Sequence, residues 1–298
     1  MSKSHFRITK SSGETAPFSP KKLLNSLERA GAKRAQAQEI LNEIRHNLFH
    51  GITTKEIYRM AFSMLKASGR HLAARYNLRR AILDLGPEGF AFEKFIAVLM
   101  SEQGYDVKHS VIFQGKCVPH EVDVFARKES EAHFIECKFH RHDGLNCDVK
   151  IPLYIHSRFN DISARFQTVP GNEKLQLTGW VVTNTRFTFD AVAYGKCAGL
   201  RLLGWNYPEK EGLRELTDKL SLYPLTCLTS LTRQEKVLLL EQDFILAAHL
   251  AGKEKELGRM GFKPAKISAV LEEVKQLCDG IADKKEAIAK SRNASSRR

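Results

Sequence analysis

The sequence predicts a multidomain protein of mixed α+β and α/β class, in which mostly helical regions flank a central α/β core. Three observations support this prediction. Apolar residues recur at helical spacing before residue 86 and again after residue 222. Between these regions, strand-like apolar segments alternate with helical ones, and Gly86, Pro87 and Gly89 interrupt the pattern at the first boundary. We therefore expect four segments, 1–86, 87–222, 223–282 and 283–298, the last of them a disordered basic tail.

The N-terminal segment predicts a short hairpin followed by helices. Residues 6–18 contain two strand-like stretches joined by a turn at Gly13. Ser19 is a suitable N-cap, and Pro20 suits the first position of a helix. Further helices are expected at about residues 35–49, 53–67 and 70–85.

The central segment predicts helices and strands in alternation. The stretch "GFAFEKFIAVLMSEQGYDV" begins with an amphipathic helix at about residues 89–103, and "SVIFQGK", "HEVDVFARK" and "EAHFIECKF" are strand candidates. A helix in "PLYIHSRFNDISARFQ", a strand in "LTGWVVTNTRFT", a helix in "DAVAYGKCAGL" and a strand in "RLLGWNY" follow. This order is typical of an α/β core.

The C-terminal segment predicts two helices, in "LTRQEKVLLLEQDFILAAHLA" and "KPAKISAVLEEVKQLC". Most of its apolar residues are expected in a packed core, among them Leu238, Leu239, Leu240, Phe244 and Ile245. The connection around "LGRMGFKP" is weakly similar to helix-hairpin-helix modules. That similarity implies DNA contacts by Arg259, Lys263 and Lys266, as an alternative to a purely packing or dimerising role.

The charge of the chain favours a polyanionic partner. The formal net charge is +13, which suits nucleic acid or a membrane surface. Residues 1–87 hold 16 Lys and Arg against 6 Asp and Glu, whereas residues 88–222 hold 17 against 18. No window is long and apolar enough for a membrane span, and the six cysteines lack a disulfide spacing. We expect a cytoplasmic protein with reduced thiols and no membrane partner.

Three charged residues on neighbouring strands predict a catalytic site. In "FIECKF" the alternation of a strand places Glu136 and Lys138 on one face, and Asp123 lies on the preceding strand. Two carboxylates held close together repel unless a divalent cation neutralises them, and oxygen ligands suit Mg²⁺ or Mn²⁺. Asp123 and Glu136 are the expected metal ligands, and Lys138 is expected to position or activate a water. This is the chemistry of phosphodiester hydrolysis.

The same residues resemble a known nuclease superfamily. Residues 89–207, with Asp123, the "IECK" of Glu136 and Lys138, and the later strand, helix and strand, resemble the Mrr-type, restriction-endonuclease-like domains of the PD-(D/E)xK superfamily. The resemblance implies a core with a mixed sheet, a supporting role for Glu93 on the first helix, DNA as substrate and a homodimer as a further expected assembly. Pro119 lies four residues before Asp123, which departs from the superfamily motif.

Nearby residues suggest two alternative roles. Cys117 with His120, and Cys137 with His140, have spacings found in zinc sites, with His142 and Cys147 close by. Alternatively, Cys137 is a core thiol and the histidines lie in a loop near DNA phosphates. The helix that follows offers cations that contact either phosphate or water: His156, Arg158 and Arg165.

The N-terminal segment resembles the ATP-cone, a regulatory nucleotide-binding domain. The residues that carry the likeness are "ITKSSGETAPFSPKKLLNSLERAGA" and "AARYNLRRAI". A triphosphate requires cations and free backbone amides. The sequence offers these at Lys10, Gly13, Lys21, Lys22, Arg75 and Arg79, and the expected ligand is ATP or dATP.

The sequence as a whole predicts a Mg²⁺-dependent DNA endonuclease with a domain that binds ATP or dATP. The alternative is a nucleotide-responsive DNA-binding regulator whose nuclease fold is inactive.

Overall fold

The computed structural model describes residues 6–10, 13–86, 89–142 and 144–278, in two compact units. Unit 1 combines residues 1–81 with residues 223–298, and unit 2 consists of residues 82–222. The N-terminal and C-terminal helical segments therefore pack together in one unit. Pro87 and the predicted tail, 283–298, lie outside the described residues. Within the described part of the chain, no helix is long and apolar enough to cross a membrane.

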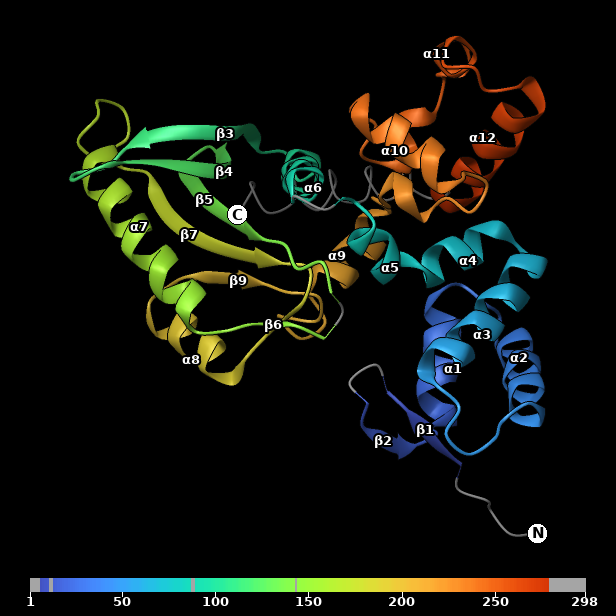
Figure 1. The fold of residues 1–298 in the computed structure, drawn as a ribbon. Coiled ribbons are helices and arrows are strands. Elements are labelled where there is room, and N and C mark those ends of the chain that lie inside the picture. Colours follow the sequence, from blue (N-terminus) through green and yellow to red (C-terminus); the bar gives the residue numbers. More distant parts are fainter. Residues whose placement is uncertain (1–5, 11–12, 87–88, 143, 279–298) are drawn as a thin grey trace, which may run out of the picture. The chain divides into compact units, whose positions relative to one another are not determined.

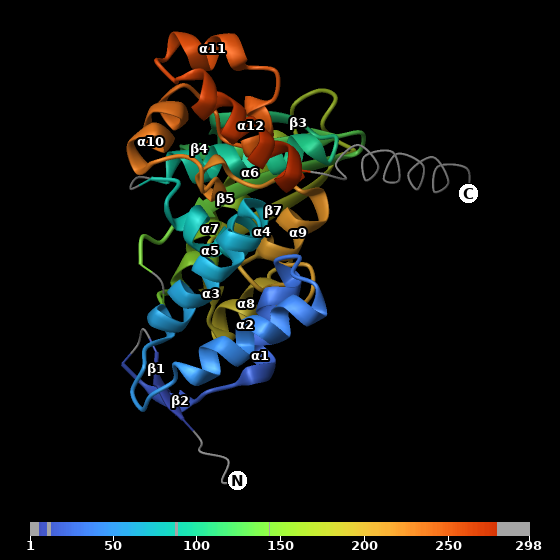
Figure 2. The same ribbon diagram turned by 90° about the vertical axis from the view of Figure 1, so that its right-hand side faces the viewer.

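Unit 1 is helical apart from one hairpin. Its elements are β1 (Arg7–Thr9), β2 (Thr15–Pro17), α1 (Pro20–Arg29), α2 (Arg34–His46), α3 (Thr54–Ser68), α4 (Arg70–Tyr76), η1 (Leu225–Cys227), α10 (Arg233–Glu241), η2 (Ala247–Leu250), α11 (Glu254–Arg259) and α12 (Pro264–Cys278). The hairpin and α1 to α3 lie at one end of the unit, and α10 to α12 lie at the other (Figures 1 and 2).

The first helix forms as its sequence predicts. The Ser19 side chain accepts a hydrogen bond from the backbone N–H of Lys22 at 3.3 Å, and Pro20 begins α1. The helix buries Leu23, Leu24 and Leu27. Each such leucine contributes about 1.5–3 kcal/mol by leaving water, so this stripe fixes α1 against the rest of the unit.

Two predicted helices are shorter than expected. The stretch 70–85 is divided at Asn77 into α4 and α5 (Leu78–Leu83), and the Asn77 side chain accepts a hydrogen bond from the Tyr58 hydroxyl at 2.6 Å. This bond ties the Asn77 side chain to α3. In the C-terminal region, α10 ends at Glu241, and Asp243 follows in the left-handed conformation with φ of 61°. Helices do not continue through that conformation.

The prediction that Leu238 belongs to the core was wrong. Leu238 is 38% exposed and Val237 is 48% exposed, whereas Leu239 is fully buried. Successive positions of a helix differ by about 100° in direction. Of Val237, Leu238 and Leu239 on α10, only Leu239 therefore faces inward. Phe244 and Ile245 are buried after the helix ends, as predicted.

Unit 2 is a mixed sheet with helices on both faces. The sheet contains β3 (Asp106–Gln114), β4 (Pro119–Lys128), β5 (Glu131–Lys138), β7 (Gln176–Thr183) and β9 (Arg201–Leu203) in that order. The first two pairings are antiparallel, and the β5–β7 and β7–β9 pairings are parallel. The mixed sheet confirms the predicted α/β class of the core.

The helices of unit 2 lie in two layers. On one face, α7 (Lys150–Phe166) and α8 (Phe189–Cys197) pack on the sheet, next to a small β6–β8 pairing (Asn146–Cys147 and Arg186–Phe187). On the other face lie α6 (Phe90–Glu102) and α9 (Leu213–Leu220) (Figure 1). Gly89 caps α6 in the left-handed conformation, with φ of 85°, which glycine adopts without steric cost.

Candidate active site

The predicted acidic residues lie on three adjoining elements of unit 2. Asp123 is on β4 and Glu136 on β5, next to the Val124–Ile135 pair with which the antiparallel ladder ends. Glu93 is in the first turn of α6, directly after the Gly89 cap. We call Glu93, Asp123 and Glu136 the carboxylate cluster.

The strand backbone holds Asp123 in place. The backbone N–H of Cys137 donates to Oδ2 of Asp123 at 2.7 Å. Burial raises the pKa of Asp123, and the bond from Cys137 and the charge of Arg158 partly oppose that rise. The Asp123 carboxylate is therefore bound to the same strand that carries Glu136.

Both glutamates of the cluster are difficult to ionise. Burial, followed by the negative charges of Asp123 and Glu121, raises the pKa of Glu93 to about 7. Burial and the charge of Asp123 raise the pKa of Glu136 to about 7, although Arg158 acts in the opposite direction. Each carboxylate makes the ionisation of its neighbours less favourable, as expected for acidic groups that share one site.

Two nitrogen-bearing side chains, Arg158 and His109, approach the cluster. Arg158 of α7 forms an ion pair with Glu136 at 2.7 Å and also donates to the backbone oxygen of Glu121. Nε2 of His109 on β3 lies 3.5 Å from Oε2 of Glu93, and burial lowers the pKa of this histidine. The sequence had placed Arg158 on a helix that contacts either phosphate or water, and its pairing with Glu136 was missed.

Lys138 lies at the end of β5 and is exposed. Burial and the Lys138 ammonium together lower the pKa of His140. Beside it, the backbone of His140 and the side chain of Asn184 exchange two hydrogen bonds of 2.8 Å, which join the ends of β5 and β7. Lys138 is thus two residues from Glu136 in the sequence. Its observed electrostatic effect is on His140, in the loop that follows β5.

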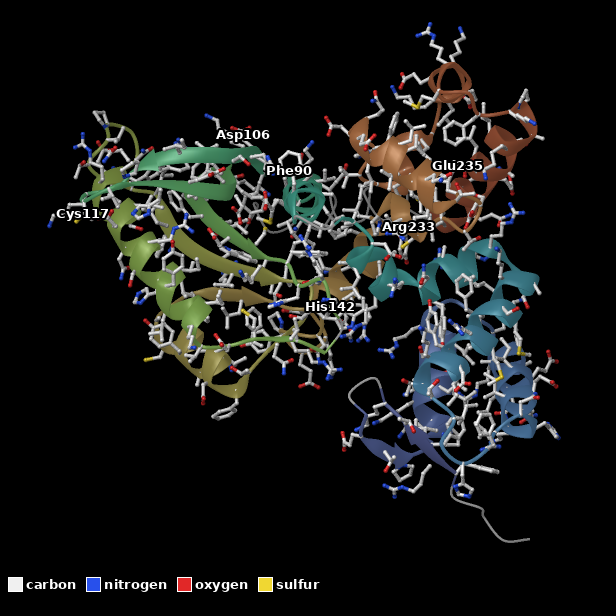
Figure 3. The ribbon with its side chains drawn as sticks, in the orientation of Figure 1. Phe90, Asp106, Cys117, His142, Arg233 and Glu235 are labelled. Carbon is white, nitrogen blue, oxygen red and sulfur yellow. The ribbon has the colours of Figure 1, made fainter. Side chains whose placement is uncertain are left out.

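The cysteines and histidines of the alternative zinc site are not gathered together. Cys117 lies in the turn between β3 and β4, well apart from His142 (Figure 3). Asp161 of α7 binds this turn through His120 Nε2 at 2.8 Å and through the backbone N–H groups of Cys117 and Val118 at 2.8 and 3.2 Å. Among the described residues, no group of three or more His, Cys, Asp and Glu side chains is arranged to hold a metal ion.

Two other predicted cations of unit 2 have hydrogen-bond partners outside the carboxylate cluster. Nδ1 of His156 lies 2.8 Å from the Tyr194 hydroxyl, which links α7 to α8. Arg165 donates to the hydroxyl of Thr168 at 3.4 Å.

The residues predicted to bind nucleotide are distributed over three parts of unit 1. Lys10 pairs with Glu14 at 2.8 Å across the hairpin turn, where Gly13 has a φ of 82°. Lys21 and Lys22 are exposed in the first turn of α1. The hairpin turn and the α1 N-terminus therefore present cations to solvent.

The two predicted arginines lie further along unit 1 and at its boundary. Arg75 of α4 donates to the backbone oxygen of Leu277 at 3.1 Å, and its guanidinium lies 5.8 Å from the centre of the Tyr223 ring. Arg79 is half-buried on α5. The structure thus brings Arg75 to the C-terminal helix α12.

The basic residues predicted to contact DNA in the C-terminal region differ in their surroundings. Lys266 forms an ion pair with Glu235 at 2.8 Å, which links α12 to the first turn of α10. Arg259 ends α11, and Lys263 precedes α12. Figure 3 shows Glu235 beside Arg233 on α10.

Comparisons with known proteins place two regions of the chain in described families. Residues 6–84 match the ATP cone domain, a nucleotide-binding regulatory domain, which confirms that prediction. Residues 223–278 match the family described as AF1548-like, C-terminal.

Two similar proteins cover a larger part of the chain. An uncharacterized protein of Archaeoglobus fulgidus is 37% identical over 193 residues, which are 61% of this chain and 99% of that protein. A crystal structure described as a protein of unknown function, AF1548, is 31% identical with a TM-score of 0.52, and it covers 64% of this chain and 98% of its own. The chain belongs to the AF1548-like family and carries an ATP cone at its N-terminal end.

Proposed function

We propose that this protein is a metal-dependent DNA endonuclease whose activity is regulated by ATP or dATP bound to the ATP cone. The carboxylate cluster is the observation that carries the proposal. Glu93, Asp123 and Glu136 are crowded and partly buried at the end of a strand pair, and two of them have pKa values of about 7. Such crowding is unfavourable for stability, and it is common where charge is used for chemistry.

The donor set of the cluster fits a hard divalent cation. Its side chains offer oxygen only, which suits Mg²⁺ or Mn²⁺ better than zinc, whose usual sites include nitrogen or sulfur ligands. Asp123 and Glu136 would hold the ion, and Glu93 would support it from α6. When bound, the ion supplies electrostatic stabilisation of the charge that develops on the phosphate.

The remaining residues would act on water and on the DNA backbone. Lys138 is exposed at the end of β5, where it would orient the water whose oxygen forms a bond to phosphorus as the bond to the deoxyribose oxygen breaks. Arg158 would exchange its bond to Glu136 for a contact with a DNA phosphate. The net charge of +13 favours a polyanionic substrate.

A second function has specific support: a nucleotide-responsive DNA-binding regulator with an inactive nuclease fold. Arg158 already neutralises Glu136, and the Cys137 backbone already occupies one oxygen of Asp123. In the described residues, no group of three metal-binding side chains is preformed. The Arg158–Glu136 ion pair would then stabilise the fold of a protein that binds DNA and does not cleave it.

Nicking of supercoiled plasmid distinguishes the two functions. We expect the full chain to nick DNA in the presence of Mg²⁺ or Mn²⁺, and we expect Asp123→Asn and Lys138→Met each to reduce the rate at least about 100-fold. Lys108→Met replaces an exposed lysine of β3 and is the control. DNA binding by a folded wild type without nicking, under every metal and nucleotide condition, would support the regulator and exclude the enzyme.

A further inference from the structure

Unit 2 contains a cavity of about 590 Å³ on the α6 side of the sheet. Its floor is formed by β5, β7 and β9, and its walls by α6, α9 and the segment 204–212 between β9 and α9. Glu93, Asp123, Glu136 and Lys138 are not among the residues that line it. Sites for small molecules are typically about 300–1,000 Å³ in volume, so this cavity has the size of a ligand site.

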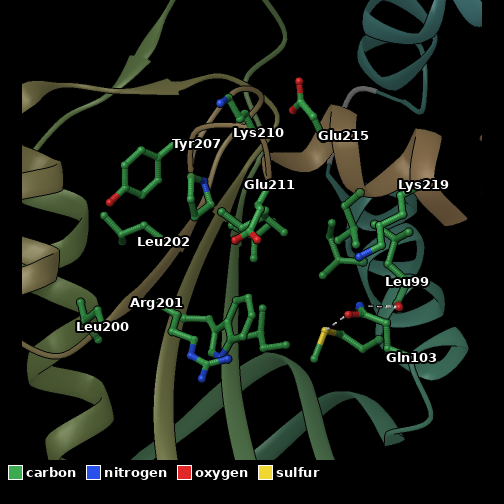
Figure 4. Close-up of a pocket in the computed structure, with 18 residues that line it drawn as sticks. Leu99, Gln103, Leu200, Arg201, Leu202, Tyr207, Lys210, Glu211, Glu215 and Lys219 are labelled. Carbon is green, nitrogen blue, oxygen red and sulfur yellow. Dashed lines mark hydrogen bonds between the residues drawn. The ribbon is translucent and has the colours of Figure 1, made fainter. Parts of the chain in front are cut away.

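The surfaces of the cavity suit a flat ring. Trp180 of β7 and Tyr207 supply aromatic surface, and Ile135, Val182 and Leu99 supply aliphatic surface. In Figure 4, Leu99 and Gln103 lie on one side of the cavity, and Leu202 and Tyr207 lie on the other. A planar apolar body between these walls would be removed from water on both faces.

Two residues that line this cavity each carry a buried polar atom without a hydrogen-bond partner among the described residues. These atoms are Nε1 of Trp180, which is a donor, and Oε2 of Glu215, which is an acceptor. The other oxygen of Glu215 accepts from Nε of Arg214 at 2.9 Å. A buried donor or acceptor without a partner costs about 1–3 kcal/mol, and a ligand that offers both an acceptor and a donor removes that cost.

The rim of the cavity carries cations. The guanidinium of Arg201 lies 5.3 Å from the centre of the Trp180 ring. The side chains of Lys210 and Lys219 make no hydrogen bond or ion pair within the part of the chain that the structure describes. Two acidic residues, Glu211 and Glu215, also line the cavity, and Glu215 is already paired with Arg214. The positive charges of Arg201, Lys210 and Lys219 therefore outnumber the one unpaired negative charge among the described lining residues, that of Glu211. These cations suit an acidic group on the ligand.

We propose that this cavity binds a heteroaromatic ring that carries an acidic group, with the size and chemistry of a nucleoside monophosphate. The ring lies against Trp180, its heteroatoms meet the Trp180 indole and the Glu215 carboxylate, and its phosphate contacts Lys210 or Lys219. The same chemistry is available from a free mononucleotide and from an unstacked base in single-stranded DNA. This site is separate from the carboxylate cluster and from the ATP cone, which binds triphosphates.

Fluorescence of Trp180 tests binding directly. The chain has two tryptophans, so Trp205→Phe leaves Trp180 as the sole reporter in the full chain. We expect saturable quenching of its emission by at least one of dAMP, dCMP, dGMP and dTMP, with Kd below about 1 mM. Quenching by a short single-stranded oligonucleotide but by no monophosphate would support the same chemistry with DNA as its source. Absence of quenching by either probe, in a chain whose circular dichroism shows a native fold, would overturn the proposal.

Matched variants locate the site by calorimetry. Trp180→Phe keeps a ring and removes the N–H donor, and it should weaken binding about 3- to 10-fold. Combined replacement of Lys210 and Lys219 by alanine should weaken it at least about 10-fold, whereas Lys108→Ala should leave Kd unchanged. Equal Kd values in all variants would place the nucleotide elsewhere. Binding that occurs only after truncation of the chain behind Cys278 would show that residues 279–298 fill the cavity, and this result would also overturn the proposal.

Discussion

The protonation states of Glu93 and Glu136 change near neutral pH. Both have pKa values of about 7, with burial as the first cause and a neighbouring carboxylate as the second. Arg158 limits the rise at Glu136 through its 2.7 Å ion pair. Near neutral pH the cluster therefore retains protons that ordinary glutamates have already lost.

The raised pKa of Glu136 predicts a pH dependence of stability. The folded value is about 7, and the ordinary value is 4.5. Between these pH values the folded chain holds a proton that the unfolded chain has lost, so the free energy of unfolding falls as pH rises through this window. Glu136→Gln cannot ionise, and its stability relative to wild type should rise from pH 4.5 to pH 7.

Urea unfolding of both chains across this pH range measures the effect. Glu209→Gln, at an exposed position of the same unit, is the control and should follow wild type. A stability difference between Glu136→Gln and wild type that stays constant or decreases with pH would show that Glu136 ionises normally in the folded chain.

At the scale of elements, the sequence predicted the regular parts of the structure well. Strand alternation placed Asp123 and Glu136 on neighbouring strands because period-two patterns depend only on local residues. The break at Asn77 and the end of α10 were missed because they depend on a long-range hydrogen bond from Tyr58 and on the backbone conformation at Asp243. The pairing of Arg158 with Glu136 joins residues 22 positions apart, and no local pattern reports such a contact.

Element α12 depends on one buried carboxylate. Glu273 is 1% exposed, and its two oxygens accept hydrogen bonds from the backbone N–H groups of Thr229 and Ser230 at 2.7 and 2.8 Å. These bonds connect the helix to the segment before α10. The side chain thus satisfies two backbone donors of a loop that has no regular structure of its own.

Replacement of Glu273 should destabilise unit 1. In Glu273→Ala the two backbone donors lose their partner, and we expect a loss of about 2–4 kcal/mol in the free energy of unfolding, measured by urea denaturation. Glu272→Ala, at the exposed neighbouring position, should change stability by less than about 0.5 kcal/mol. Equal effects of the two substitutions would contradict this role of Glu273.

At the scale of the whole molecule, the ATP cone and the C-terminal region form one compact unit. The hydrogen bonds that join them include Arg75 to Leu277, Nδ1 of His71 to Oε1 of Gln276 at 3.0 Å, and the hydroxyl of Thr226 to the backbone oxygen of Ala81 at 2.6 Å. Helix α4 of the cone thus packs directly on α12. Under the proposed function, nucleotide bound to the cone would act on the C-terminal region through this contact.

Arg75 tests how the two parts are connected. Arg75→Met should increase amide hydrogen exchange in the last turn of α12, because the bond to Leu277 is lost, and it should leave the Kd for ATP within about 3-fold of wild type. Lys66→Met, at an exposed position of α3, is the control. A loss of ATP affinity of more than about 10-fold, without a change in α12 exchange, would instead identify Arg75 as a phosphate ligand.

The central claim is that the carboxylate cluster supports phosphodiester hydrolysis. Its most direct test is the Mn²⁺-dependent nicking of supercoiled plasmid by Glu136→Gln and by wild type, purified in parallel and shown to bind the same DNA equally well. Phosphodiester hydrolysis at this cluster predicts nicking by wild type and a rate at least about 100-fold lower for Glu136→Gln. Equal nicking by both chains, or none by either, would contradict it.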